Sequence, residues 1–217
     1  MLEKRMLIEV LRSTGLVAIL RGITPAEAAA IGDALFAAGF RIIEVPLNTK
    51  DAVESIHILR TRLPRECLVG AGTVTTPAQV EAVRIAGGEL IVMPHSDASV
   101  IRAAKVARLS VMPGVATPTE AFAALAAGAD ALKMFPAELL GPSVLKAWRA
   151  VLPAATALVS VGSITPERLA SFVAAGATGA GLGGALYAPG NSAREVATRA
   201  AAFVEAWNAA RDWHAEP

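Results

Sequence analysis

The feature that most constrains the fold of this chain is a repeated way of starting helices. Four segments open with Thr-Pro, which joins a good N-cap to a residue suited to the first helical position; they begin at Thr24, Thr76, Thr117 and Thr165. In the first three, Glu or Gln stands three residues after the Thr and can close a capping box. In the fourth, Glu comes one residue early, so a capping box is doubtful there.

Glycine closes the same four helices. Gly39, Gly87, Gly128 and Gly176 each follow an alanine, and glycine just past a helix end adopts the left-handed conformation at little cost. These glycines lie 48, 41 and 48 residues apart, about the length of two strand–helix units. A short apolar run follows each one.

Eight short apolar runs alternate with the helical segments, as is typical of parallel strands covered by helices. Eight such units favour a closed barrel over an open doubly wound sheet. We therefore expect an α/β fold, a single (β/α)8 TIM barrel over residues 1–217, with one helix before the first strand and a C-terminal helix. The expected strands are 17–21, 41–46, 67–73, 90–93, 110–113, 131–135, 157–161 and 180–183.

Composition excludes several functional classes. The net charge is +1 and no basic stripe is visible, so we expect no nucleic-acid partner and no attraction to a membrane surface. Residues 169–193 carry no charge and could span a bilayer by length, but six glycines divide them into a helix end, a strand and a loop. The single cysteine and the lack of a signal peptide predict a cytoplasmic protein.

Lys133 is the strongest candidate for catalysis. It lies between apolar residues near the C-terminal end of an expected strand, where barrel enzymes place their chemistry. A lysine at a strand end can simply extend to solvent. In an apolar pocket lined by residues such as Phe135, however, desolvation disfavours the charged form and makes the amine a nucleophile.

Glu44 is a similar anomaly, an acid within the apolar run 41–46. A structural ion pair is the ordinary alternative. The second and sixth strands of an eight-stranded ring lie opposite one another, so Glu44 and Lys133 can meet over the barrel axis. An amine nucleophile beside a carboxylate proton shuttle is the pair that Schiff-base chemistry requires.

Other strand ends offer polar groups for a substrate. Arg21 follows Val17 and Ile19 on the inward phase and can clamp a carboxylate, and the Thr73 hydroxyl comes at the end of its strand. The last two strands end in small residues that suit phosphate binding through backbone N–H groups; they are Gly162, Ser163, Gly183 and Gly184. Tight structural turns are the alternative for these loops.

Two motifs do not support a cofactor or a metal. Residues 179–184 match G-x-G-x-x-G, but no βαβ unit with an acidic residue follows, so we expect no dinucleotide. The three histidines, His57, His95 and His214, have no metal-ligand spacing. We therefore expect neither a cofactor nor a metal.

Six motifs together resemble the 2-keto-3-deoxy-6-phosphogluconate/6-phosphogalactonate aldolase family: LRGITP (20–25), EVPLNT (44–49), GAGTV (70–74), PGVATPTEA (113–121), ALKMFPAE (131–138) and GAGLGGALY (179–187). The resemblance implies a metal-free class I aldolase, usually trimeric, whose substrate is a phosphorylated 2-keto-3-deoxy acid. It implies that Lys133 forms the Schiff base, that Glu44 transfers protons and that Thr73 lies beside the substrate carbonyl. Further substrate contacts are expected at Pro94, Phe135 and Val161.

Departures from the gluconate-type pattern indicate the galactonate branch. Asn48 stands where gluconate-type members have arginine, Arg21 offers the guanidinium from the first strand instead, and Val161 replaces the usual Thr. Ser163 replaces a usual glycine and Gly184 a usual serine in the phosphate loops. Gluconate or dual specificity remains an alternative, as do a sugar-phosphate isomerase with Glu44 as base and a barrel that only binds a ligand.

Overall fold

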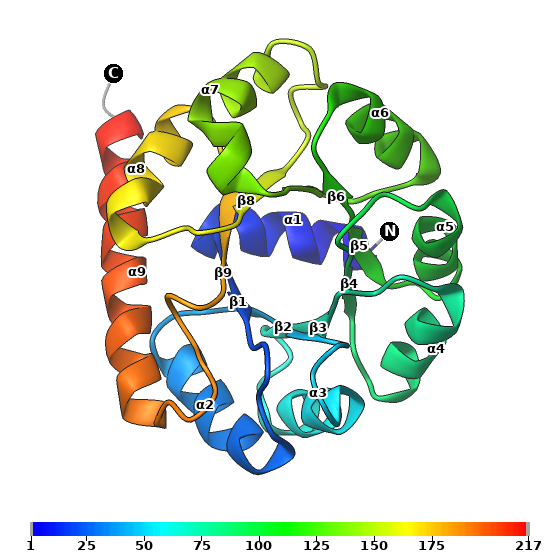
Figure 1. Cartoon of the computed structure of the whole chain (residues 1–217), viewed down its shortest axis with the longest axis vertical. Helices are drawn as coiled ribbons and strands as arrows, with labels where there is room; N and C mark the ends of the chain where they lie inside the picture. The colour runs from blue at the N-terminus through cyan, green and yellow to red at the C-terminus, as the bar shows by residue number, and fades with distance from the viewer. Residues whose placement is uncertain (1, 216–217) are drawn as a thin grey trace.

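A closed ring of parallel strands with helices outside it forms the centre of the molecule (Figure 1). The computed structural model describes the backbone of residues 2–215 and the side chains of residues 7–212. In chain order the elements are α1 (Leu2–Thr14), β1 (Leu16–Ile19), α2 (Pro25–Ala37), β2 (Ile42–Pro46), α3 (Ala52–Arg62), β3 (Leu68–Gly72), α4 (Pro77–Ile85), β4 (Leu90–Val92), α5 (Ala98–Val106), β5 (Ser110–Met112), β6 (Gly114–Val115), α6 (Pro118–Ala127), β7 (Leu132–Met134), α7 (Ala137–Arg149), β8 (Leu158–Val161), α8 (Pro166–Ala174), β9 (Gly179–Leu182) and α9 (Ala193–Ala215).

The fifth expected strand is divided in two. The strand order is β5-β4-β3-β2-β1-β9-β8-β7-β6, so the ring closes through the short segment that joins β5 to β6. β5 pairs with β4, whereas β6 pairs with β7. Pro113 lies between them and has no N–H to donate to a ladder, but its carbonyl accepts a hydrogen bond from the Lys133 N–H at 2.9 Å. The barrel prediction is confirmed, with this interruption added.

The helix boundaries follow the Thr-Pro and glycine signals. Capping boxes are present at Thr24, Thr76 and Thr117, and the fourth start at Thr165 has no side-chain cap. The four closing glycines all have φ between 86° and 107°, the left-handed region that glycine enters cheaply. Local interactions are therefore enough to account for these boundaries.

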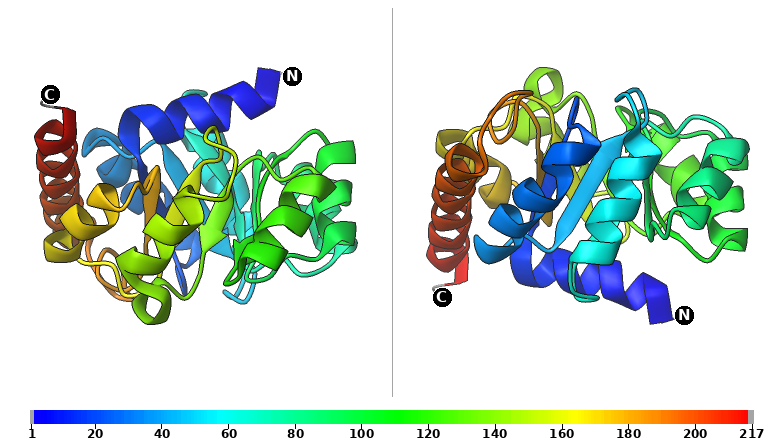
Figure 2. Two further views of the ribbon diagram at one scale, coloured as in Figure 1. Left: turned by 90° about the horizontal axis from the view of Figure 1, so that it is seen from above. Right: turned by 90° about the horizontal axis from the view of Figure 1, so that it is seen from below.

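The helix α1 closes one end of the barrel. Figure 2 shows it lying across that end, and its Leu7 and Leu11 side chains are fully buried in the same cluster as the barrel-interior residues Val17 and Ile42. Burying each leucine contributes about 1.5–3 kcal/mol. The N-terminal segment was expected only as a flanking helix, and in the structure it covers the end of the barrel at which the strands begin. The C-terminal ends of the strands form the opposite end.

The uncharged stretch 169–193 divides as expected. It contains the end of α8, the buried strand β9 and the loop that leads to α9. Among the helices of the described chain, none has the length and apolar character needed to cross a membrane.

Candidate functional site

Glu44 is buried inside the barrel on strand β2. Ile42, two residues earlier, belongs to the barrel-interior cluster, so strand alternation places Glu44 on the same face, and its exposed fraction is 2%. Gly72 on β3 makes room for it, because a Cβ there would lie 1.8 Å from Glu44 Oε2. In the described structure Oε2 has no hydrogen-bond partner. Burial raises the Glu44 pKa to about 7.

Lys133 faces the same interior from strand β7. Its exposed fraction is 8%, so it does not extend to solvent. Nζ lies 4.6 Å from the centroid of the Phe135 ring. Burial lowers the Lys133 pKa, which is the direction a nucleophilic amine requires.

The two groups influence each other across the barrel. β2 and β7 are four steps apart around the ring, so their residues face one another. The positive charge of Lys133 lowers the pKa of Glu44, and the negative charge of Glu44 raises the pKa of Lys133; in both cases the effect of burial is larger. No ion pair within 4 Å joins them in the described part of the chain. The charge of each group therefore affects the pKa of the other, although the two do not form a direct ion pair.

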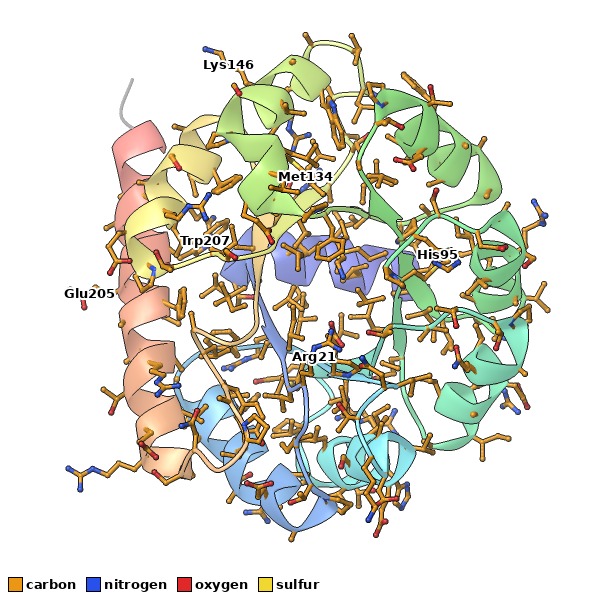
Figure 3. The ribbon with its side chains drawn as sticks, in the orientation of Figure 1. Arg21, His95, Met134, Lys146, Glu205 and Trp207 are labelled. Carbon is orange, nitrogen blue, oxygen red and sulfur yellow. The ribbon has the colours of Figure 1, made fainter. Side chains whose placement is uncertain are left out.

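Arg21 adds a third charged group at the C-terminal end of the strands, just after β1. Seen down the axis, it lies within the ring of strands (Figure 3), and its charge lowers the pKa of both Glu44 and Lys133. Arg21 Nη1 donates to Asn48 Oδ1 at 2.6 Å. The sequence marked Asn48 only as a departure from a pattern, and its role as the partner of Arg21 became visible in the structure.

The expected substrate contacts come from several strand ends. Thr73 follows β3 directly in a left-handed conformation with φ of 55°, and Pro94 comes two residues after β4. Val161, the last residue of β8, is buried in the interior cluster, where its side chain lies beside Gly181. All of these positions are at the end of the barrel opposite α1.

The two glycine-containing loops lie on neighbouring strands, since β8 pairs with β9. Within the described residues, no acceptor contacts the backbone N–H groups of Gly162, Ser163, Gly183 and Gly184. A Cβ added at Gly183 or Gly184 would meet nothing within 4 Å, so the backbone there is open to a ligand. These loops offer unpaired donors, as an anion site requires.

Glu138, which the sequence reasoning did not select, lies beside the first of these loops. A Cβ at Gly162 would be 1.9 Å from Glu138 Oε2, so the carboxylate packs against that glycine. Its position in the first turn of the helix after the Lys133 strand was the available signal. A negative charge here is unfavourable to a bound anion unless a positive charge offsets it.

Two further observations concern the rest of the molecule. Among the described residues, no group of three or more His, Cys, Asp or Glu side chains could hold a metal ion.

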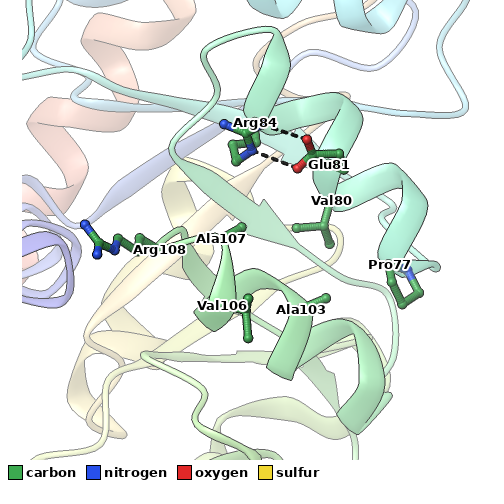
Figure 4. A pocket seen from close by; sticks show the side chains of 8 residues that line it. All are labelled: Pro77, Val80, Glu81, Arg84, Ala103, Val106, Ala107 and Arg108. Atoms are coloured by element: carbon green, nitrogen blue, oxygen red, sulfur yellow. Dashed lines mark hydrogen bonds and ion pairs between the residues drawn. The ribbon is translucent and has the colours of Figure 1, made fainter.

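A depression of about 500 Å³ lies between α4 and α5 on the outer layer, where Arg84 and Glu81 form an ion pair (Figure 4). Its helices lie outside the barrel, so it is separate from the Lys133 site.

Comparison with known proteins identifies the family of this chain. The model of the family described as "Aldolase: KDPG and KHG aldolase" matches residues 7–199. This chain belongs to the KDPG and KHG aldolase family. A 2-dehydro-3-deoxy-6-phosphogalactonate aldolase of Escherichia coli (strain K12) is 49% identical over 195 residues, which are 90% of this chain and 95% of that protein.

Two solved structures share the barrel. One, described as "Native KDPGal structure", has a TM-score of 0.90 and 48% sequence identity. The match covers 92% of this chain and 97% of the chain in that structure. The other is a cube-shaped protein cage designed by fusing symmetric oligomeric domains, with a TM-score of 0.91 and 47% sequence identity. The match covers 93% of this chain and 75% of the chain in that structure. As a member of this family the chain is a lyase, an aldolase of the class I Schiff-base type.

Proposed function

We propose that this aldolase cleaves 2-dehydro-3-deoxy-6-phosphogalactonate to pyruvate and D-glyceraldehyde 3-phosphate, with Lys133 as the Schiff-base lysine. The observation that carries the proposal is the buried, electrostatically coupled pair of Lys133 and Glu44 inside the barrel. Burying an amine and a carboxylate in an apolar interior without a direct ion pair lowers the stability of the fold. A catalytic role for the two groups accounts for their being there.

In the first stage the neutral amine of Lys133 attacks the C2 ketone of the substrate. Burial lowers the lysine pKa and so increases the fraction of neutral amine at pH 7. The carbinolamine then loses water to give an iminium ion, and a proton donor must supply the leaving hydroxyl. Glu44, with a pKa of about 7, holds such a proton in part of the molecules at neutral pH.

In the second stage the C3–C4 bond breaks. Glu44 as carboxylate takes the proton from the C4 hydroxyl, the C4–O bond becomes the aldehyde carbonyl, and the electron pair of C3–C4 passes into the enamine. Glu44 then returns its proton to C3, and water hydrolyses the pyruvate iminium to free Lys133. A single group can serve in both directions because its pKa lies near the working pH.

Other residues bind the parts of the substrate that do not react. We assign the carboxylate to Arg21, whose guanidinium is fixed by Asn48, and the carbonyl surroundings to Thr73, Pro94, Phe135 and Val161. The phosphate is assigned to the open loops at Gly162, Ser163, Gly183 and Gly184, which supply unpaired N–H donors.

The galactonate epimer is favoured over the gluconate epimer by three features. Asn48 and Val161 replace the arginine and threonine of the gluconate pattern, Arg21 offers its guanidinium from the end of β1, and the Escherichia coli relative is a 2-dehydro-3-deoxy-6-phosphogalactonate aldolase. The two substrates differ in configuration at C4, one of the two atoms of the bond that breaks. Measuring kcat/KM for both C4 epimers tests this choice, and a higher value for the gluconate epimer would reverse it.

Borohydride trapping tests the mechanism itself. Incubation with pyruvate and borohydride should add one reduced pyruvate to the wild type, and peptide mapping should place it on Lys133. Lys133→Ala should lose both trapping and turnover. Lys146→Ala, on the outer helix α7, is the matched control and should retain both (Figure 3). A sugar-phosphate isomerase or a silent barrel would form no adduct.

We propose further that the protein is a cytoplasmic homotrimer. The family resemblance and the symmetric oligomeric domains of the cage support self-association. Apolar side chains gather on one outer face, where Val53 on α3, Ile85 on α4 and Val106 on α5 are 42%, 71% and 86% exposed. Surfaces of this kind mark protein contacts, and we expect this face to bind a second copy.

Light scattering at a fixed protein concentration tests the assembly. The wild type should have the mass of three chains, and Ile85→Glu with Val106→Glu should dissociate it. Val151→Glu introduces the same charge at another exposed apolar residue and should leave the trimer intact. A monomeric wild type, or dissociation by Val151→Glu alone, would contradict the assignment.

A further inference from the structure

Ser163 adopts a backbone conformation that its side chain disfavours. Its φ is 47°, in the left-handed region, where a residue with a Cβ pays a steric cost that glycine avoids. Gly162, immediately before it, also has positive φ, at 125°. A strained conformation of this kind persists only when surrounding contacts hold it, so the loop needs such a contact.

Arg168 supplies that contact from helix α8. Its Nη1 donates a hydrogen bond of 2.7 Å to the carbonyl oxygen of Ser163. The guanidinium carbon lies 5.7 Å from the centroid of the Phe172 ring, one turn further along the same helix. The cation is therefore held between a ring on its own helix and the strained residue of the loop.

This hydrogen bond also orients a donor on the far side of the peptide. The peptide unit is planar and trans, so the carbonyl of Ser163 and the N–H of Ile164 point in opposite directions. Fixing the carbonyl toward Arg168 therefore points the Ile164 N–H away from it. Within the described residues that N–H has no acceptor, so it is an unpaired donor.

The charge of Arg168 completes the argument. Glu138 places a carboxylate against Gly162, and a phosphate dianion bound at this loop would be repelled by it. Arg168 is the only cationic side chain that the described structure records in a hydrogen bond to residues 162–165. Arg168 therefore brings a positive charge to the loop against which Glu138 places a negative one.

We propose that Arg168 is a positioning residue for phosphate recognition. It holds Ser163 in the left-handed conformation that turns the loop N–H groups toward the phosphate ester, and it offsets the charge of Glu138. This inference rests on the proposed function, because it assumes that residues 162–165 bind the substrate phosphate. It explains how the loop keeps a left-handed conformation at a residue that has a side chain.

The test is a double-mutant cycle between Arg168→Ala and Ser163→Gly, with inorganic phosphate as the probe. In the wild-type background Arg168→Ala should raise the phosphate inhibition constant and the KM of the phosphorylated substrate about tenfold, the loss expected for one charge-assisted hydrogen bond. In the Ser163→Gly background the same change should cost about threefold or less, since glycine adopts the conformation unaided. Arg102→Ala, an exposed arginine on α5, is the control and should change neither constant.

Two further readouts separate the possible explanations. Pyruvate trapping by borohydride should be unchanged in every variant, because Arg168 acts on the phosphate loop alone, and circular dichroism should show an intact fold. Equal factors in the two backgrounds would show that Arg168 acts only through its charge and would overturn the positioning role. An unchanged phosphate inhibition constant in Arg168→Ala would overturn the whole proposal. Failure of the wild type to trap pyruvate would instead refute the proposed function.

Discussion

The buried carboxyl of Glu44 should make the stability of this protein depend on pH in a specific way. Its pKa is 4.5 in an unfolded chain and about 7 in the folded protein, chiefly because burial disfavours the charged form. Below pH 4.5 the group is neutral in both states and costs nothing. As the pH rises toward 7 the unfolded chain ionises first, so stability is lost, and above pH 7 the loss is constant.

The magnitude follows from the two values. Each pKa unit corresponds to about 1.36 kcal/mol, so ionising Glu44 in the folded protein costs about 3 kcal/mol. Glu44→Gln removes the ionisation. The free energy of unfolding of the variant minus that of the wild type should therefore increase by about 3 kcal/mol between pH 4.5 and pH 8.

Urea unfolding followed by circular dichroism, at one protein concentration and at several pH values, measures this difference. Glu205→Gln, on the outer surface of α9, controls for the loss of a charge and should show no such increase (Figure 3). Repeating the comparison in a Lys133→Met background should make the increase larger and extend it to higher pH, because the lysine charge lowers the pKa of Glu44 in the folded protein only. A difference that stays flat from pH 4.5 to 8 would refute the claim that Glu44 is desolvated in the folded protein.

Four other predictions address activity. Glu44→Gln should slow turnover by about 10²–10⁴ while still permitting some borohydride trapping, since proton transfer by a positioned side chain is worth that much; wild-type turnover would make Glu44 structural. Arg21→Leu should raise the KM of the keto acid and weaken pyruvate binding by similar factors of about ten to a hundred, and unchanged pyruvate affinity with relief of phosphate inhibition would place Arg21 in the phosphate site. Gly72→Ala should cut turnover sharply in a steady-state assay because its Cβ would occupy the place of Glu44 Oε2. Activity should survive EDTA, and its loss with rescue by zinc or magnesium would indicate a metal-dependent enzyme.

Much of the fold was readable because its signals are local. Thr24, Thr76 and Thr117 cap their helices through residues three positions away, and the closing glycines act through their own φ angles. Strand alternation likewise placed Glu44 and Lys133 on the interior face once a barrel was assumed. The interruption at Pro113 was not predicted. It is recognised only from the pairing, because β5 pairs with β4 whereas β6 pairs with β7.

Periodicity, capping and motif order are properties of short stretches of chain, so the sequence was enough to predict the barrel and the family and to select Lys133 and Glu44 as candidates. Which residues meet became visible only in the folded protein. Asn48 reaches Arg21 across 27 positions, Gly72 clears space for Glu44 from a neighbouring strand, and the burial that raises the Glu44 pKa is produced by the whole interior. Desolvation and hydrogen bonds between distant residues depend on distances that exist only after the ring has closed, so no local pattern can encode them.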